Sequence, residues 1–559
     1  MKPVRLSPLD SSYLSMDGPV TVGHVCIMCP LDGPVTMEQL RSRVTERIDR
    51  LPAMRRRLQT TLVGLGRPWW VDDSDFHLDQ HLFEVTLSGG GDDLELSKHV
   101  ARIATGRLNR AHPLWEFHLV QGIRGGSTAL VTKIHHAVMD GIAARDLLYD
   151  LFGQDELAGP ADDTDTGPAA DRDQDGVERW TPGPWPSELE LIYRSIKDTQ
   201  GWLGTVARFE YRATSAIVQG AEKAVGGVLG GVTGILRRGG EAARTSTDGT
   251  DLAAADQPAA PAKPDRSWWS IAPDSILNGP VSDARSYAFG SRDMPSSRPL
   301  RHSTATTVND IVIAAAAGGL RAWLQEHDAV PDEPLVAMIP IGGRTAPGRE
   351  DVGGNRLALT LCTMPTQLDD PYERLMFSHD AMARAKNTPS LDESLLEDLF
   401  RVTAPGLTSL TAEAFYRLHL ATRIRFPYNL VITNVPGSPR PLGIGEATVT
   451  GLHPCPPLID TIGLNLAVHG YRDRLCFGIS ACPDLLPNVG HLMALILRSH
   501  DDLLALGPEL VDEQPGQPQA PEAAGGPAPG PPPAPGRGGR RSTGPKRSAT
   551  VTAPARRRR

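Results

Sequence analysis

The chain contains little cysteine and no long hydrophobic run, and these two shortages exclude several classes of protein. Six cysteines in 559 residues are too few for a disulfide-stabilised scaffold. No stretch of about 18 uncharged apolar residues is present, so we predict no transmembrane helix. The opening residues, MKPVRLSPLDSSYLS, hold no apolar run of signal-peptide length. We therefore expect a protein of the reducing cytoplasm.

Positive charge is also scarce outside the C-terminal end. The chain has 57 basic and 66 acidic residues, a net charge of −9, yet its last 23 residues hold nine Lys or Arg and no acid. The remainder therefore carries −18, which argues against a nucleic-acid-binding core, and we expect no nucleic-acid partner. Residues 515–559 contain 11 Pro and 8 Gly, a composition that predicts a disordered tail.

The one close pair of cysteines lies in an apolar segment. Cys26 and Cys29 form a CxxC within HVCIMCPL, and no second pair follows at zinc-site spacing. The pattern favours buried thiols in a β-strand over redox chemistry.

Helical and extended patterns alternate through two long stretches of the chain, which predicts an α/β or α+β fold. We divide the chain into an N-terminal domain (1–158), a linker with a helical crossover (159–265), a C-terminal domain (266–512) and a tail (513–559). The expected helices are 37–58, 95–110, 187–240, 308–325, 371–387 and 487–506, and the expected strands are 128–134, 335–341, 428–434, 463–469 and 474–480.

The predicted helical crossover, residues 187–240, has two interpretations. Gly226, Gly230 and Gly234 repeat every four residues within its apolar part, but only 13 residues there run without a charge. That length is too short to span a bilayer. The segment either lies on a lipid surface as an amphipathic helix or packs on the body of the protein.

The segment KIHHAVMDG, residues 133–141, carries the most specific chemistry. A predicted strand runs into His135 and His136, and a helix with one apolar face begins near Gly141. A histidine in such a turn can take a proton from an alcohol that attacks an acyl carbon. Asp140 either fixes the local geometry or caps the helix.

Other chemistries lack support in the sequence. A metal site built from His135, His136 and Asp140 is disfavoured because adjacent histidine side chains diverge and no HExxH motif is present, so we expect no metal. Neither a GxSxG nucleophile elbow nor a GxxxxGK[ST] loop occurs.

The HHxxxDG pattern resembles the active-site signature of the CoA-dependent acyltransferase superfamily, which includes chloramphenicol acetyltransferase and peptide-synthetase condensation domains. Further segments resemble one branch, the bacterial wax ester synthase/diacylglycerol acyltransferase family. They are LSPLDSSYLSMDGP (6–19), PLWE (113–116), LNGPV (277–281), TVND (307–310), IPIGGR (339–344), GNR (354–356), NLVITNVPGSPRPL (429–442) and the stretch 453–488.

This resemblance implies a fold and a reaction. The fold would be two chloramphenicol-acetyltransferase-like domains with an active-site tunnel between them. The reaction would transfer a fatty acyl group from acyl-CoA to diacylglycerol, giving triacylglycerol, or to a long-chain alcohol, giving a wax ester. Acyl-CoA is a substrate, so no cofactor is expected. The protein would associate peripherally with a membrane or with lipid inclusions.

The resemblance also implies roles for individual residues. His136 would be the general base, with His135 in a supporting role and Asp140 and Gly141 shaping the turn. Asn309 would border the tunnel, although it also suits a helix cap. Thr433 and Asn434 are candidates to stabilise the oxyanion, or are turn residues. Arg344 and Arg356 would bind CoA phosphates or pair with Asp140.

Two other functions remain open at this point. One is a condensation-type acyltransferase that makes a different ester or amide. The other is a non-catalytic protein of a lipid surface, which the Gly-rich helix and the basic tail would suit.

Overall fold

The computed structural model describes two long parts of the chain, which we call the N-terminal half (3–154) and the C-terminal half (272–512). The described ranges are 3–18, 20–61, 67–139, 141–154, 182–183, 186–187, 189–194, 272–342, 357–387, 426–437 and 439–512. All of them belong to one compact unit, Met1–Asp512. Most of the predicted crossover helix, and the whole tail, lie outside the described residues.

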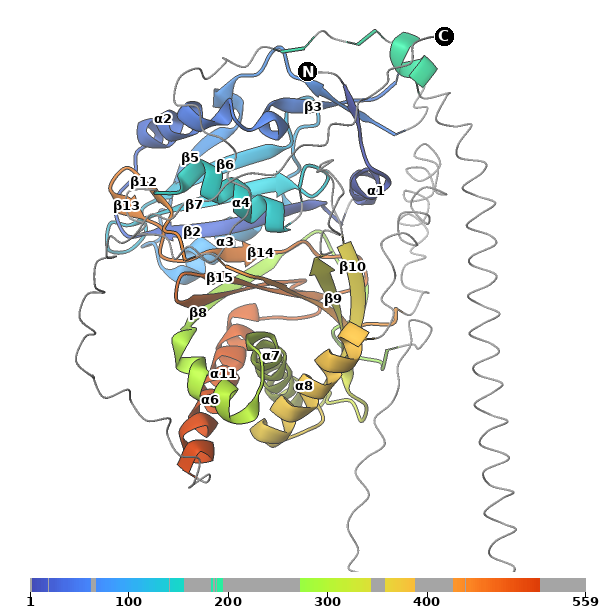
Figure 1. Ribbon diagram of the computed structural model, residues 1–559, viewed down its shortest axis with the longest axis vertical. Helices are drawn as coiled ribbons and strands as arrows, with labels where there is room; N and C mark the ends of the chain where they lie inside the picture. Colours follow the sequence, from blue (N-terminus) through green and yellow to red (C-terminus); the bar gives the residue numbers. More distant parts are fainter. Residues whose placement is uncertain are drawn as a thin grey trace, which may run out of the picture. The chain divides into compact units, whose positions relative to one another are not determined.

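The N-terminal half combines two sheets with four α-helices (Figure 1). Its helices are α1 (Pro8–Met16), α2 (Met37–Ile48), α3 (Asp93–Thr105) and α4 (Gly141–Phe152). Two 3₁₀ turns lie at Pro52–Arg55 and Leu78–Gln80. Its strands are β1 (Val4–Arg5), β2 (His24–Leu31), β3 (Arg56–Gln59), β4 (Trp69–Asp72), β5 (Leu82–Thr86), β6 (Trp115–Gln121) and β7 (Thr128–His135).

The C-terminal half is built around a larger sheet. Its strands are β8 (Ser286–Asp293), β9 (Leu335–Gly342), β10 (Leu357–Met364), β11 (Leu430–Val435), β12 (Gly443–Ile444), β13 (Ala447–Thr448), β14 (His453–Cys455), β15 (Leu464–Tyr471) and β16 (Arg474–Ala481). Its helices are α6 (Arg298–Thr304), α7 (Val308–Gln325), α8 (Pro371–Asn387) and α11 (Val489–Asp512), and a 3₁₀ turn at Pro295–Ser297 leads into α6.

The C-terminal half adds one strand to the main sheet of the N-terminal half. The five-stranded sheet has the order β14-β2-β7-β6-β5, and the six-stranded sheet has the order β10-β9-β11-β15-β16-β8. β14 comes from the C-terminal half but pairs antiparallel with β2, so that Cys455 lies opposite Cys26. Both sheets mix parallel and antiparallel pairs. The halves therefore share backbone hydrogen bonds and cannot be separated without breaking a sheet.

Helices cover the outer faces of the two sheets, and α3 lies between them (Figure 1). In the C-terminal half, a core that includes Trp323, Phe477 and Leu492 joins the sheet to α7, α8 and α11. In the N-terminal half, α2 and α4 pack on Phe117 and the rest of one sheet face. On the opposite face of that sheet, residues of α3 pack against residues of β2, β7, β8 and β14.

Within the described residues, the sequence predicted six of the eight α-helices, two of them too long, and six of the sixteen strands. The predicted helix 37–58 ends at Ile48, because Pro52 opens a 3₁₀ turn and residues 56–59 pair with β4 instead. The predicted helix 95–110 ends at Thr105, where Gly106 follows in an extended conformation. The strand prediction for HVCIMCPL is confirmed, with Cys26 and Cys29 buried as free thiols.

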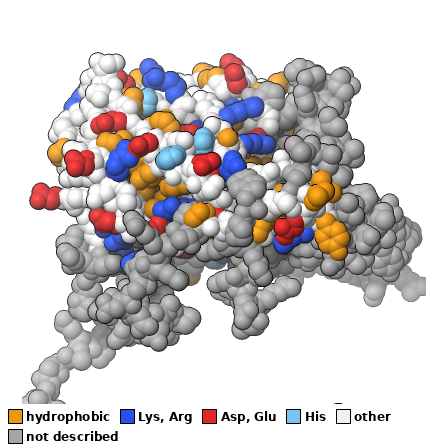
Figure 2. All heavy atoms as spheres, turned by 90° about the horizontal axis from the view of Figure 1, so that it is seen from above, with side chains coloured by type: hydrophobic (Ala, Val, Ile, Leu, Met, Phe, Trp, Pro, Cys, Tyr) orange, Lys and Arg blue, Asp and Glu red, His pale blue; other side chains and the backbone are white. Residues whose placement is uncertain are grey.

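Acidic and basic side chains are interspersed with hydrophobic ones over the described part of the face seen in Figure 2. No single sign of charge dominates there, so this face does not have the uniformly basic surface that nucleic-acid binding needs. In the described ranges, no helix is long and apolar enough to cross a membrane.

Candidate active site

The histidine pair lies where the central strand β7 of the N-terminal sheet ends. His135 is the last residue of β7 and lies opposite His24 of β2 in the antiparallel ladder. The His136 N–H donates a hydrogen bond of 2.7 Å to the Gly23 carbonyl, and the Val138 N–H donates one of 2.9 Å to the His135 carbonyl. The backbone of the turn is therefore fixed on both sides before α4 begins.

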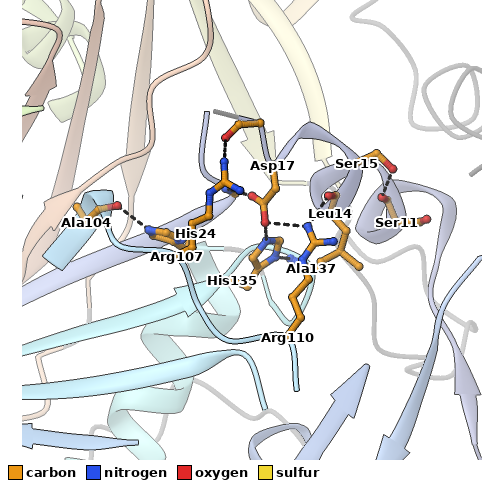
Figure 3. Close-up of polar contacts among 12 residues, drawn as sticks. Ser11, Leu14, Ser15, Asp17, His24, Ala104, Arg107, Arg110, His135 and Ala137 are labelled. Carbon is orange, nitrogen blue, oxygen red and sulfur yellow. Dashed lines mark hydrogen bonds and ion pairs between the residues drawn. The ribbon is translucent and has the colours of Figure 1, made fainter. Parts of the chain in front are cut away.

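Both ring nitrogens of His135 have partners. The Ala137 N–H donates to His135 Nδ1 at 3.0 Å, so Nδ1 acts as the acceptor and carries no proton. His135 Nε2, which lies 3.2 Å from Asp17 Oδ2, is then the nitrogen that donates (Figure 3). The side chain is only 2% exposed. With both nitrogens used in this way, His135 is poorly placed to accept a proton from a substrate.

Asp17 follows α1 and joins three parts of the N-terminal half. Its carboxylate accepts hydrogen bonds from His135, from Arg110 Nη2 at 3.0 Å and from the Gly23 N–H at 2.6 Å. Burial alone would raise the pKa of Asp17, but the bonds from His135, Arg110 and Gly23 outweigh it and hold the pKa well below its ordinary value. The carboxylate is therefore a permanent negative charge beside His135.

Gly23 packs against this pair so closely that a Cβ atom would crowd both side chains. A Cβ atom at Gly23 would lie 3.0 Å from Asp17 Oδ1 and 3.0 Å from both Cε1 and Nε2 of His135. The same residue binds Asp17 through its N–H and His136 through its carbonyl. Gly23 thus holds the His136 backbone directly and His135 through Asp17.

His136 has a different environment from its neighbour. Its ring stacks on Tyr13 of α1, with centroids 4.8 Å apart and planes inclined by 14°, and it is partly exposed. Burial, reinforced by the nearby His135, lowers the pKa of His136 to about 4. The imidazole is therefore neutral at pH 7, which is the form that can accept a proton.

The turn meets the C-terminal half at the end of β11. A Cβ at Gly141 would lie 3.6 Å from Val435 Cγ2, so the start of α4 lies against the last residue of β11. The adjacent Asn434 Nδ2 donates a hydrogen bond of 3.4 Å to Asn309 Oδ1 in the first turn of α7. The structure thus brings together two segments, TVND and NLVITNVPG, that lie far apart in the sequence.

The structure also separates the roles of Asn309 and its neighbour in the first turn of α7. Asp310 and Thr307 form a capping box, and Asp310 Oδ2, which accepts the Thr307 N–H, also lies 2.9 Å from His379 Nδ1. The cap is therefore supplied by Thr307 and Asp310. Asn309 is half-buried and makes its contact with Asn434 instead.

The remaining candidates are placed less completely. Thr433 is half-buried in β11 and pairs with Ala467 of β15. Asp140, Arg344 and Arg356 lie outside the described residues, so the predicted partner of Asp140 and the predicted tunnel remain predictions. Trp115, in the PLWE segment, is 1% exposed and donates from Nε1 to the Met54 carbonyl.

Sequence reasoning missed three residues that contact the histidine pair. They are Tyr13, Asp17 and Gly23, and all lie in or just after the segment 6–19. That segment indicated the family but gave no residue a role. No spacing rule places Asp17 beside His135, because 118 positions separate them and only the pairing of β2 with β7 brings them together.

The mixed α/β fold and the HHxxxDG turn after β7 resemble those of the CoA-dependent acyltransferase superfamily. Within that class, the chain belongs to the wax ester synthase/diacylglycerol acyltransferase family. Residues 6–312 match the family's catalytic domain, and residues 353–503 match its C-terminal domain.

Known relatives span almost the whole chain. A provisionally named diacylglycerol O-acyltransferase of Mycobacterium tuberculosis is 28% identical over 509 residues, which covers 89% of this chain and 99% of the relative. The O-acyltransferase WSD of Acinetobacter baylyi is 27% identical over 503 residues, 87% of this chain and 94% of that protein. The solved wax ester synthase/diacylglycerol acyltransferase from Marinobacter aquaeolei VT8 shares the fold, with a TM-score of 0.56, 21% identity and coverage of 90% and 100%.

Proposed function

We propose that this protein transfers a long-chain acyl group from acyl-CoA to the hydroxyl of diacylglycerol or of a long-chain alcohol. The observation that carries this proposal is the pair of unequal histidines in the turn after β7. One is fixed by Asp17 and Ala137, and the other is neutral and partly exposed beside Tyr13. Membership of the family supplies the reaction class and the two acceptor classes.

His136 is the general base in this mechanism. It takes the proton of the acceptor hydroxyl as that oxygen attacks the thioester carbonyl. A C–O bond forms, and the carbonyl oxygen becomes an oxyanion. The C–S bond then breaks, the carbonyl is restored, and the CoA thiolate takes the proton back from His136. The atoms balance without a covalent acyl-enzyme and without a cofactor.

The low pKa of His136 is compatible with this role. It keeps the ring neutral before the reaction, because burial disfavours the imidazolium. When the tetrahedral intermediate forms, its negative charge lies near the ring and favours the protonated form. The proton affinity of His136 thus rises only while the intermediate exists.

The oxyanion requires a hydrogen-bond donor in a site that excludes water. Asn434 and Thr433 remain our candidates, because the end of β11 lies beside the turn that carries His136. The Asn434 amide already donates to Asn309, so Asn309 would act by orienting this amide rather than by touching the oxyanion.

The acceptors are nearly insoluble in water, so we also propose that the protein works at a lipid surface. The surface would supply diacylglycerol or alcohol from a membrane or a lipid inclusion. Flotation of the full chain with phosphatidylcholine vesicles containing diolein tests this point. Protein that stays at the bottom of the gradient with and without diolein would contradict surface association.

Release of free CoA from palmitoyl-CoA tests the proposed reaction. The purified chain is given diolein, hexadecanol or no acceptor, beside His136→Ala. We expect acceptor-dependent release that falls by about 10²–10⁴-fold in the variant, the usual contribution of a general base. The preferred acceptor identifies the product as triacylglycerol or wax ester.

His302→Ala is the matched control, because His302 is exposed on α6. It should keep the wild-type rate, and circular dichroism should show both variants folded. Full activity in a folded His136→Ala protein would contradict the mechanism. Acceptor-independent CoA release would indicate a thioesterase instead.

A further inference from the structure

A large cavity lies between the two halves, beside the segment that holds the histidines. Its volume is about 1060 Å³, at the upper end of the range usual for small-molecule sites. One side is formed by α3 and the other by the start of β8 and the start of α11. Val20 and Val22, which lie shortly before Gly23 in the chain, complete the wall.

The wall on the β8 side is largely apolar. Tyr287 and Phe289 contribute to it, with their rings 6.0 Å apart and inclined by 21°. Ala101 of α3 and Met493 of α11 face the same space. A ligand in this cavity therefore meets aromatic and aliphatic surface.

Basic side chains line the same cavity. Lys98 and Arg102 are one helical turn apart on exposed positions of α3, Arg107 follows the end of that helix, and Arg285 lines the wall ahead of β8. None of the four forms an ion pair with a carboxylate in the described parts of the chain. Two acidic residues, Asp93 and Asp283, also line the cavity, which leaves an excess of two positive charges there. This excess occurs in a chain whose net charge is −9.

Arg285 is held by main-chain oxygens rather than by a counter-ion. Its guanidinium donates to the carbonyls of Ser282, Ala284 and Val20, and burial lowers its pKa. Carbonyls do not neutralise the positive charge of the guanidinium, which the nearby Asp283 and Asp460 stabilise without forming an ion pair. The guanidinium N–H groups that these carbonyls do not occupy can donate to phosphate oxygens.

Two arginines of the cavity donate hydrogen bonds to the backbone of the segment that positions the histidines. Arg107 donates to the Gly18 carbonyl, and Arg285 donates to the Val20 carbonyl. Both carbonyls lie in the segment between Asp17 and Gly23, which fixes His135 and His136. A ligand bound by these two arginines therefore lies against the segment that positions the catalytic turn.

We propose that this cavity binds the phosphate-bearing end of acyl-CoA, with Lys98, Arg102, Arg107 and Arg285 around the phosphates and the apolar wall against the rest of the nucleotide. The proposal rests on the proposed function, which makes acyl-CoA the substrate. The phosphate of an acidic lipid headgroup offers similar chemistry, and the experiment separates these two sources.

The test is the charge-reversed double variant Lys98→Glu/Arg102→Glu, compared with Lys386→Glu on α8. Both exchanges are at exposed helical positions, so folding should be preserved. Isothermal titration calorimetry gives the Kd of CoA and of 3′-dephospho-CoA. We expect the double variant to weaken CoA binding about tenfold or more, equivalent to about 1.4 kcal/mol, and Lys386→Glu to leave it unchanged.

Kinetics then separate this site from the acceptor site. The KM for palmitoyl-CoA should rise in the double variant, while the KM for the acceptor should not. An unchanged CoA Kd would overturn the proposal. If the double variant instead lost binding to phosphatidylglycerol vesicles and kept its CoA affinity, the basic residues would be a lipid-headgroup site and the proposal would also be wrong.

Failure of the proposed function gives a different result. In one outcome, wild-type protein binds CoA through Lys98 and Arg102 and yet releases no free CoA from palmitoyl-CoA with any acceptor. That result would support the CoA-binding site and contradict the proposed acyl transfer. If wild-type acyl transfer were normal and the double variant bound CoA with unchanged affinity, the proposed reaction would be supported and the proposal that the cavity binds CoA would be wrong.

Discussion

Asp17 and His135 form a 3.2 Å hydrogen bond in which His135 donates from Nε2, because its Nδ1 is occupied by the Ala137 N–H. The bond ties the segment after α1 to the end of β7. It also explains why two adjacent histidines are not equivalent. The one with a carboxylate partner is fixed in place, and its neighbour in the turn keeps a partly exposed imidazole.

Replacement of Asp17 by Asn should therefore impair the rate more than substrate binding. The amide keeps the size of the side chain but loses the charge that His135 and Arg110 share. We expect kcat to fall about tenfold, equivalent to about 1.4 kcal/mol, with smaller changes in KM. The free energy of unfolding should fall by about 1–3 kcal/mol. Steady-state kinetics and urea denaturation measure both, and the exposed Asp332→Asn serves as the control.

Asp17→Glu distinguishes positioning from simple packing. Glutamate keeps the charge but lengthens the side chain, so kcat should recover partly even if stability does not. If Asp17→Asn and Asp17→Glu were destabilised alike and had the same kcat, Asp17 would have only a structural role.

The lowered pKa of Asp17 predicts how stability depends on pH. In the unfolded chain the carboxyl takes up a proton near its ordinary value of 3.8, whereas in the native protein it stays ionised to lower pH. Its contribution to stability is therefore present above about pH 4 and is lost as the pH falls below that value. The difference in unfolding free energy between wild type and Asp17→Asn should shrink from pH 5 to pH 3. A constant difference over this range would contradict the assigned interactions.

The activity profile should reflect the lowered pKa of His136. A base with a pKa of about 4 stays neutral well below the ordinary histidine value of 6.5. The acid limb of kcat/KM, which reports groups of the free enzyme, should therefore lie near pH 4. Initial rates after brief pH jumps measure it, with tryptophan fluorescence to confirm that the protein remains folded. An acid limb near pH 6.5 would show that His136 is not the titrating base or that its ring is solvated.

The packing of Gly23 gives a prediction with a matched glycine control. Gly23→Ala places a methyl group 3.0 Å from atoms of Asp17 and His135, so one of the two must move. We expect a loss of about 1–3 kcal/mol in stability, the usual cost of overpacking, and a lower kcat. Gly33→Ala places its methyl 3.6 Å from Ala447 Cβ, an ordinary contact, and should be close to neutral. Thermal unfolding and CoA release compare the two, and equal effects would mean that Gly23 does not constrain the pair.

Much of this fold follows from local sequence patterns. The helix 308–325 agrees with α7 because Thr307 and Asp310 cap it and its apolar residues continue without a break. The strand before His135 was predicted because it is apolar and a turn follows. α6 was not predicted, since RPLRHST is short and polar and becomes helical beside α11.

The candidate site was only partly predictable for a physical reason. His135 and His136 are adjacent in the sequence, so a motif reveals them. Asp17 reaches His135 only through strand pairing, and Asn434 reaches Asn309 only because the C-terminal half folds β11 beside α7. No short-range pattern contains such contacts. The resemblance to a family brought Asn309 and Asn434 into consideration, but it did not indicate that they contact each other.

The contact between Asn309 and Asn434 gives the last prediction. Asn434 Nδ2 donates to Asn309 Oδ1 at 3.4 Å, so removing Asn309 should free the amide of Asn434 and misdirect it. If Asn434 donates to the oxyanion, Asn434→Ala should lower kcat about 10²-fold or more, the usual effect of losing one such donor. Asn309→Ala should lower it less, and the double variant should be no worse than Asn434→Ala alone, because both changes act through one amide. Rates that multiply in the double variant would show that the two residues act independently and that the hydrogen bond between them has no part in catalysis.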